Sequence, residues 1–299
     1  MINMNNNEKE YLKILQELVD LSDTDESLKN RTDVKAYKVF GRSMTFDLSD
    51  NKIPLLTTKK INPTNIFHEL LWMFILKNPD TSYLDENGVN IWNQWKVPLG
   101  DSFTIGEMYG QVLRNFKDEF DQKNSLFNTD QLAKTIDLLK TTPQTRRAVF
   151  SLFDPRAVAD ESESFKTNVE EGRGVLNNCH GMVNQFDINS DGDLEFITYQ
   201  RSADVFLGIP YNIVFYSTFC HMVAQVLGLK CTKMIYHLGN THLYENCLEQ
   251  AKIQLSRDGY PDPILSLNPD IKDFDSFRIQ DLKVSGYRHH GFLKAPVAV

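Results

Sequence analysis

The sequence predicts an α+β fold in which helices pack against one large mixed sheet. Helical and strand-like segments follow one another without the regular strand–helix–strand order of a parallel α/β protein. The 299 residues are 41% hydrophobic and 24% charged, which is typical of a globular protein with a large core. Because the chain shows neither a repeat nor a linker-like boundary, we expect a single domain over residues 1–299.

The first half of the chain alternates between helical and strand-like patterns. Leucines and isoleucines recur at helical spacing in residues 8–21, whereas residues 36–48 alternate like a strand. Residues 63–76 have the pattern of a strongly apolar helix. We expect a further helix over residues 131–139 and a buried strand over 147–153.

The second half begins with a hairpin pattern. Residues 184–188 and 194–200 have strand character and flank an Asn-Ser-Asp-Gly-Asp turn. A long, mostly apolar helix is expected over residues 212–227 and another over 243–257. The C-terminal part is strand-like around residues 277–287.

One internal segment has a different composition. Residues 156–174 are rich in Asp, Glu and Ser and poor in large apolar side chains, which predicts a segment without regular structure. Strand signals resume on both sides, so we interpret it as an acidic surface insertion and not as a linker.

Charge and cysteine usage narrow the functional classes. A net charge of -8 argues against a broad DNA-binding face, and local arginine clusters then favour a pocket for a small anion. The four cysteines are far apart and lack zinc-site spacing, so we expect no metal. Neither a signal peptide nor a membrane span is indicated, because the N-terminus is polar and polar residues interrupt the apolar stretch 209–229. We therefore expect a cytoplasmic protein that binds neither membrane nor DNA.

A thiol and an imidazole are adjacent at Cys179 and His180, and an arginine–serine pair follows at Arg201 and Ser202. A thiolate is a strong nucleophile towards carbon near neutral pH, and nearby cationic groups lower its pKa. This combination predicts a nucleophile next to an anion-binding surface.

Two polar residues in apolar segments have a structural and a functional interpretation. Glu69 either lies on the wet face of its helix or is a buried carboxyl with a raised pKa that acts as a general acid or base. Asn212 on its own is more typical of a helix cap, and the alternative is an amide that pairs with a pyrimidine edge.

For several other residues the structural interpretation is the more common one. Adjacent arginines at the start of a strand, such as Arg146 and Arg147, are usually solvated. Trp92 and Trp95 are typical of a core, although a close pair can stack on a flat ligand. His242 on its own is more typical of a structural histidine.

Taken together, these blocks resemble the thymidylate synthase family. The similarity runs from Arg31 to Val299 and is most specific in residues 199–212, residues 54–72 and the apolar tail 295–298. The resemblance implies a large mixed sheet packed with helices, with one sheet face forming a homodimer interface. It also implies one-carbon transfer from 5,10-methylenetetrahydrofolate to C5 of dUMP, giving dTMP and dihydrofolate.

The resemblance assigns a catalytic role to five positions. Cys179 matches the nucleophile that adds to C6 of the uracil ring. Glu69 matches the carboxyl that organises proton-transfer waters, and Tyr109 and His180 belong to the same network. Asn212 matches the amide that recognises the O4 and N3 edge of uracil.

Further positions match groups that bind the nucleotide and the folate. The implied phosphate ligands are Arg31, Arg146, Arg147, Arg201 and Ser202, with the adjacent arginines donated by the other subunit. The implied contacts to the deoxyribose hydroxyl are His242 and Tyr244. The implied folate contacts are Lys59, Ile91, Trp92, Asp204 and Val299, with Asp204 also beside the nucleotide.

Two departures from the family pattern lie close to the nucleophile. Asn177 and Asn178 stand where the family usually has prolines. The segment after Cys179 is one residue longer than usual, so either Asn184 or Gln185 fills the family's glutamine position.

These departures support an alternative activity within the same fold. A dUMP hydroxymethylase uses the same cysteine and folate but lets water complete the reaction, which gives 5-hydroxymethyl-dUMP and tetrahydrofolate. Asn212 favours uracil over cytosine in either case. A third interpretation, a nucleotide- or RNA-binding protein without turnover, is disfavoured by the presence of Cys179, Glu69 and Asn212 together.

Overall fold

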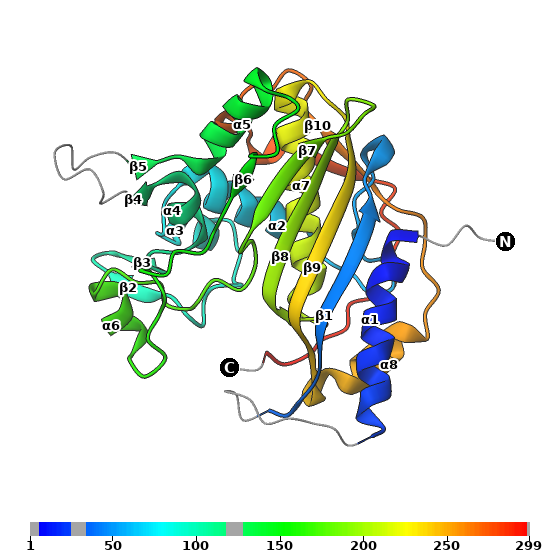
Figure 1. Ribbon diagram of the computed structural model, residues 1–299. Coiled ribbons are helices and arrows are strands. Elements are labelled where there is room, and N and C mark those ends of the chain that lie inside the picture. The colour runs from blue at the N-terminus through cyan, green and yellow to red at the C-terminus, as the bar shows by residue number, and fades with distance from the viewer. Residues whose placement is uncertain (1–5, 25–33, 118–127, 298–299) are drawn as a thin grey trace.

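A five-stranded mixed sheet forms the centre of the computed structural model, which describes residues 6–24, 34–117 and 128–297 (Figure 1). Strands β8 and β9 are parallel, and the other neighbours are antiparallel. The predicted α+β class with a mixed sheet is confirmed. In spatial order the strands are β1 (Ala36–Asp47), β9 (Cys231–Tyr244), β8 (Leu194–Asp204), β7 (Asn184–Ile188) and β6 (Val149–Phe150).

Helix α7 (Ile209–Leu227) covers one face of this sheet, and α2 (Pro63–Leu71) packs against α7 (Figure 1). Most of α7 is buried because it lies between the sheet and other helices. The Phe74 ring, just beyond α2, meets the rings of Phe215 and Phe219 edge-on at 5.0 and 5.1 Å. Such aromatic packing fixes α2 relative to α7 and therefore fixes the residues that both helices carry.

Figure 1 shows no helix over the opposite face of β7, β8 and β9, whereas α1 (Asn6–Ser22) lies beside β1 at the edge of the sheet, next to α8 (Leu248–Leu255). The remaining elements are α3 (Ser82–Glu86), β2 (Val97–Leu99), β3 (Ser102–Thr104), α4 (Tyr109–Arg114), β4 (Phe116–Lys117), β5 (Asn128–Thr129), α5 (Gln131–Thr141), α6 (Phe165–Glu170), β10 (Ile264–Leu267), β11 (Leu282–Ser285) and the π-helical turn η2 (Trp72–Leu76).

Several predicted boundaries are wrong, including the starts of two helices and the buried strand expected over residues 147–153, of which only β6 (Val149–Phe150) is a strand. The helix expected over residues 243–257 begins only at Leu248, because β9 continues to Tyr244 and Leu243 pairs with Tyr37 of β1. The helix expected from Asn212 begins at Ile209, so Gly208 occupies the cap position. The capping interpretation of Asn212 is therefore wrong, and its side chain is available for another role.

The acidic segment 156–174 is more regular than its composition predicts, because it contains α6. Ser164 caps this helix by accepting a hydrogen bond from Thr167 N at 3.1 Å. Asn168 is buried and donates to the carbonyl oxygens of Asp160 and Ser164. A buried amide therefore provides the order that large apolar residues would provide elsewhere.

Candidate active site

Cys179 lies in the loop that precedes β7, and its side chain is half-buried. Tyr109 Oη lies 3.4 Å from the Cys179 sulfur and accepts a hydrogen bond from Cys179 N at 3.1 Å. Burial raises the pKa of the thiol, while the Tyr109 hydrogen bond and the positive charge of Arg201 lower it without reversing the shift. The thiol is therefore protonated at neutral pH in the ligand-free protein, and attack on carbon requires removal of this proton.

Close backbone packing places Tyr109 beside this thiol. Tyr109 opens α4, and a Cβ atom on Gly110 would lie only 2.0 Å from the carbonyl oxygen of Met73 in the π-helical turn. Glycine therefore allows α4 to approach that turn. The Tyr109 ring then stacks on the His180 ring with a centroid distance of 4.4 Å.

His180 is buried and bonded away from the thiol. Its Nδ1 lies 2.8 Å from Tyr216 Oη, and burial lowers the pKa of the imidazole to about 3. The following residue, Gly181, has φ +67, and a Cβ atom there would lie 2.3 Å from Tyr216 Oη. An imidazole with so low a pKa binds a proton too weakly to serve as the base of a cysteine–histidine pair.

Glu69 provides a titratable carboxyl close to the thiol. The Trp92 indole N–H donates to Glu69 Oε1 at 2.9 Å, and burial raises the pKa of the carboxyl to about 7. Its charge also acts on the Cys179 thiol and the Tyr216 phenol. Of the two interpretations of Glu69, this environment favours the general acid or base, because such a group exchanges protons at neutral pH.

The orientation of Asn212 is fixed by Gln200, a residue that the sequence did not single out. Gln200 Nε2 donates to the carbonyl oxygen of Ser202 at 2.7 Å, so its Oε1 faces the other way. This Oε1 accepts from Tyr236 Oη at 2.7 Å and from Asn212 Nδ2 at 3.0 Å. Asn212 therefore keeps one N–H and its Oδ1 for a ligand.

The guanidinium of Arg201 contacts the loop that carries Cys179. Its Nε donates to Asn178 O at 2.8 Å and its Nη2 donates to Asn177 O at 2.9 Å. These bonds use two of the five N–H groups of an arginine, so three remain for an anion. Ser202 is the next residue and is half-buried.

Arg146 and Arg147 lie apart from this group, just before β6 at the edge of the sheet. Both are exposed, and neither guanidinium forms an ion pair with any residue in the described part of the chain. Arg31 and Val299 lie outside the described residues.

The parallel strands β8 and β9 bring together the residues predicted at the sugar and folate. Asp204 pairs with His242 in the strand register, and Tyr244 follows with its ring centroid 5.1 Å from that of His242. Burial raises the pKa of Asp204, whose Oδ1 accepts from Phe206 N and Leu207 N at 3.0 Å each. This arrangement leaves Asp204 Oδ2 as a possible acceptor for a ligand.

Lys59 is enclosed and not presented at the surface. Its Nζ donates to Phe206 O and lies 3.6 Å from the centre of the Phe206 ring. Burial lowers the pKa of this amine to about 7. A contact to a bound folate therefore requires movement of the side chain or of the segment that covers it.

The folate positions Trp92 and Ile91 have different exposure. Trp92 is buried among aromatic rings, with the centroids of Trp72 and Tyr109 both at 6.1 Å, while Ile91 is half-buried. The C-terminal segment contacts the residues that precede Lys59. The backbone N–H of His290 donates to Thr57 O at 2.8 Å. That bond ties the tail to the residues just before Lys59.

Asn184 and Gln185 point to opposite faces of β7. Asn184 is buried and donates to Gly181 O at 2.8 Å, two residues beyond Cys179. Gln185 pairs with Val149 and lies on the other face. Asn184 is thus the residue that faces the loop of the nucleophile.

Sequence reasoning missed Gln200 and Tyr216 as parts of this site. Tyr216 lies in an apolar helix that gave no functional signal, and Gln200 was taken only as a strand residue. Their roles depend on contacts to residues far along the chain, which no local pattern contains.

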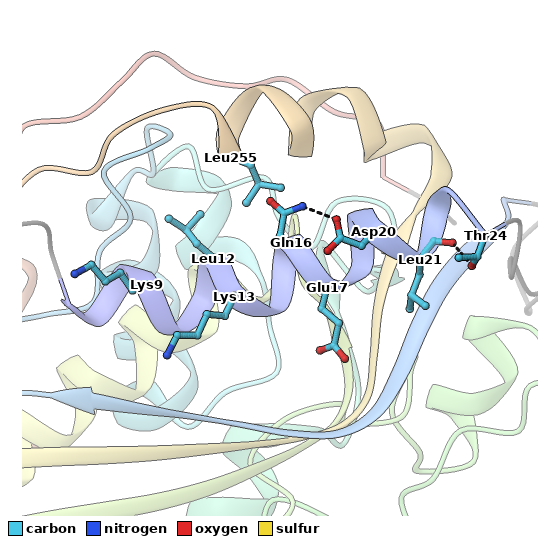
Figure 2. A pocket seen from close by; sticks show the side chains of 9 residues that line it. All are labelled: Lys9, Leu12, Lys13, Gln16, Glu17, Asp20, Leu21, Thr24 and Leu255. Carbon is cyan, nitrogen blue, oxygen red and sulfur yellow. Dashed lines mark hydrogen bonds between the residues drawn. The ribbon is translucent and has the colours of Figure 1, made fainter.

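A surface groove between α1 and α8 is separate from these residues (Figure 2). Leu12, Leu21 and Leu255 contribute its apolar part, and charged side chains of α1 surround them. The groove contains none of the predicted site residues.

Within the described ranges, no helix is long and apolar enough to cross a membrane. The same residues contain no group of three or more His, Cys, Asp or Glu side chains that could hold a metal ion.

The fold and the site together define an α+β protein with a thiol, a titratable carboxyl and an oriented amide within one region. The family model described as thymidylate synthase matches residues 9–299, nearly the whole chain. The chain therefore belongs to the thymidylate synthase family, whose members carry out folate-dependent one-carbon transfer to dUMP.

Proposed function

We propose that this protein transfers a one-carbon unit from 5,10-methylenetetrahydrofolate to C5 of dUMP and releases dTMP and dihydrofolate. The observation that carries this proposal is the placement of the Cys179 thiol beside Tyr109 Oη, at 3.4 Å, within the field of Glu69. The nucleophile, the proton carrier and the pyrimidine-reading amide belong to three different parts of the chain, namely the loop before β7, α2 and α7, and α2 packs against α7.

The first step is addition of the Cys179 sulfur to C6 of the uracil ring. The thiol loses its proton, the S–C6 bond forms, and the electrons of the C5–C6 double bond move towards O4. Asn212 is oriented to donate its free Nδ2–H to O4 and to accept from N3–H, because Gln200 occupies the other Nδ2–H. Stabilising the charge on O4 makes C5 a carbon nucleophile.

The later steps need a group that moves protons near neutral pH. C5 attacks the one-carbon unit carried by the folate and loses its hydrogen as a proton. The bond between that carbon and the folate then breaks, and cleavage of the S–C6 bond restores the C5–C6 double bond. Glu69, whose pKa burial raises to about 7, is suited to pass these protons through water. Bound folate supplies the one-carbon unit and, in the synthase reaction, the hydride that completes the methyl group.

The residues on the folate side fit such a ligand. Asp204 Oδ2 is an acceptor held in place by the two backbone N–H groups on Oδ1. Trp92 and Ile91 provide apolar surface for the folate, and Val299 at the end of the apolar tail is a further proposed folate contact. Lys59 lies close to Asp204, because its amine contacts the ring of Phe206, two residues further along the chain.

The nucleotide phosphate is bound, in this proposal, by arginines of two subunits. Arg201 contributes its three remaining N–H groups, with Ser202 beside it and Arg31 from the same chain. Arg146 and Arg147 carry no ion pair within their own described chain and lie at the sheet edge, so they are suited to reach a partner's site. His242 and Tyr244 hold the deoxyribose hydroxyl.

An exposed face of the central sheet supports a homodimer. Val149 pairs with Gln185, Gln185 with Ile197 and Ile197 with Ile235, so these four side chains form a row on the sheet face opposite α7. Val149 is 45% exposed and Ile197 is 37% exposed in the single chain. A second copy would bury this row and bring the arginine pair close to the neighbouring phosphate site.

The alternative is a dUMP hydroxymethylase, and the Asn177-Asn178 pair is the observation that favours it. Polar residues in place of the usual prolines change the loop directly before the nucleophile. The aromatic surroundings of Glu69 and Trp92 favour the synthase, because a hydride step needs water to be excluded.

Product analysis separates the two activities. The enzyme is incubated with dUMP and 5,10-methylenetetrahydrofolate, and the nucleotide products are identified by mass spectrometry. The proposal predicts dTMP together with an absorbance rise from dihydrofolate. Formation of 5-hydroxymethyl-dUMP without dihydrofolate would establish the alternative, and absence of both products would refute the proposed function.

A further inference from the structure

The loop before Cys179 is held by the side chains of two consecutive asparagines. Asn177 Oδ1 accepts a hydrogen bond from Ala159 N at 2.7 Å, and Asn178 Nδ2 donates to Leu152 O. Leu152 follows β6, whereas Ala159 belongs to the segment 156–174. The loop is therefore fastened to two separate parts of the chain immediately before the nucleophile.

The backbone of the same two residues binds Arg201. The carbonyl oxygens of Asn178 and Asn177 accept from Arg201 Nε and Nη2 at 2.8 and 2.9 Å. Arg201 N in turn donates to Cys179 O at 2.9 Å. Because the asparagine side chains and carbonyls have different partners, the loop cannot rotate without breaking contacts that place the guanidinium.

Burying the amide of Asn178 destabilises the folded protein unless this amide forms a compensating contact. It is only 8% exposed, and its Oδ1 is buried without a hydrogen-bond partner among the described residues. Leaving a buried acceptor unsatisfied costs about 1–3 kcal/mol, which an apolar side chain would avoid. The Nδ2 bond to Leu152 O is the contact that this residue gains in return.

Several ionisable groups face the Cys179 thiol. Tyr109 from α4 and Glu69 from α2 affect the pKa of the thiol. Burial raises the pKa of Tyr216 from α7 and of Tyr236 from β9, and the charge of the thiolate raises both further. The tyrosines are neutral near pH 7 and Glu69 is neutral or negative, so Arg201 is the positive charge in this set. The position of its guanidinium therefore matters for a thiolate at this site.

We propose that Asn177 and Asn178 are positioning residues that hold the Arg201 guanidinium against the loop that carries Cys179 and thereby set the reactivity of the nucleophile. The kinetic consequence rests on the proposed function. The reactivity of the thiol itself does not, because it can be measured without substrate.

The test compares both loop asparagines with a buried asparagine elsewhere. Asn178→Ala removes the bond to Leu152 O, and Asn177→Ala removes only the bond to Ala159 N. Asn7→Ala is the matched control, since Asn7 is 2% exposed and bonds the backbone of Asp47, away from the loop and from the segment 156–174. All three folded proteins are treated with iodoacetamide over a range of pH, and peptide mass spectrometry assigns the modification to Cys179.

The inference predicts that the pH midpoint of Cys179 alkylation moves upward in Asn178→Ala and in Asn177→Ala, but not in Asn7→Ala. In turnover, kcat of the loop variants falls roughly tenfold to a hundredfold, as expected for a misplaced reacting group. An unchanged midpoint in the folded loop variants would overturn the inference, as would an equal shift in Asn7→Ala. Absence of turnover in the unmodified enzyme would refute the proposed function and leave the alkylation result to decide this inference.

Discussion

Burial determines the charge of the titratable side chains around Cys179. The His180 imidazole stays neutral because its pKa falls to about 3, and the Glu69 carboxyl titrates near neutral pH because its pKa rises to about 7. We therefore assign proton transfer in the proposed mechanism to Glu69, whereas His180 bonds Tyr216 and stacks on Tyr109. An adjacent Cys-His pair in a sequence does not by itself define a catalytic dyad.

At the residue scale, the proposed function assigns the choice of pyrimidine to Asn212. Asn212→Asp replaces the donor for O4 with an acceptor, so the charged side chain repels uracil and can accept from the amino group of cytosine. We expect kcat/KM for dUMP to fall at least roughly a hundredfold and the ratio of dCMP to dUMP conversion to rise. Gln200→Leu, which frees Asn212 without changing its chemistry, should weaken dUMP use without favouring dCMP. An unchanged ratio in Asn212→Asp would contradict this account.

At the element scale, α2 buries a carboxyl that costs stability. Between pH 4.5, the ordinary pKa of Glu69, and about pH 7, its pKa in the folded protein, the folded state binds more protons than the unfolded state. The contribution of Glu69 to stability is therefore most favourable below this window and declines as the pH rises through it. The 2.5-unit difference sets an upper limit of about 3 kcal/mol.

Glu69→Gln keeps an acceptor for the Trp92 indole but removes the ionisation. We expect the variant to exceed the unmodified protein in free energy of unfolding at about pH 8, by up to about 3 kcal/mol, and to match it near pH 4. Urea unfolding at both values measures the difference. A variant that is less stable at the higher pH would contradict a raised pKa for Glu69.

The elements that the sequence predicted well are those with a strong local pattern. Helices α1 and α5 and strand β1 lie close to their expected ranges, because each has a regular local pattern of apolar and polar residues. The end of β9 and the helix α6 were not predicted, since they depend on pairing with β1 and on the buried Asn168. The same limit applies to the site, where Gln200 acts only through Asn212 and Tyr236.

At the scale of the whole molecule, the open sheet face and the arginine pair predict a shared active site. The Cys179→Ser variant has intact arginines. A double variant that carries both Arg146→Ala and Arg147→Ala has an intact thiol. In a mixed dimer, one of the two sites combines the intact thiol with the intact arginines. Random reassociation of equal amounts should restore about a quarter of the unmodified activity.

The control for this experiment is each inactive variant refolded alone. If the arginines acted within their own chain, mixing would restore nothing above that background. Sedimentation analysis of the unmodified protein provides the second check, because a monomer would exclude a shared site.

The central claim is that the Cys179 thiol activates C5 of dUMP for substitution. Substitution at C5 must expel the hydrogen bound there, whichever product follows. The most direct measurement uses dUMP labelled with tritium at C5 and follows folate-dependent release of tritium into water, for the unmodified protein and for Cys179→Ser. We predict release by the unmodified protein and none by Cys179→Ser, although that variant still binds dUMP. Equal release by both proteins, or no release by the unmodified one, would contradict the account.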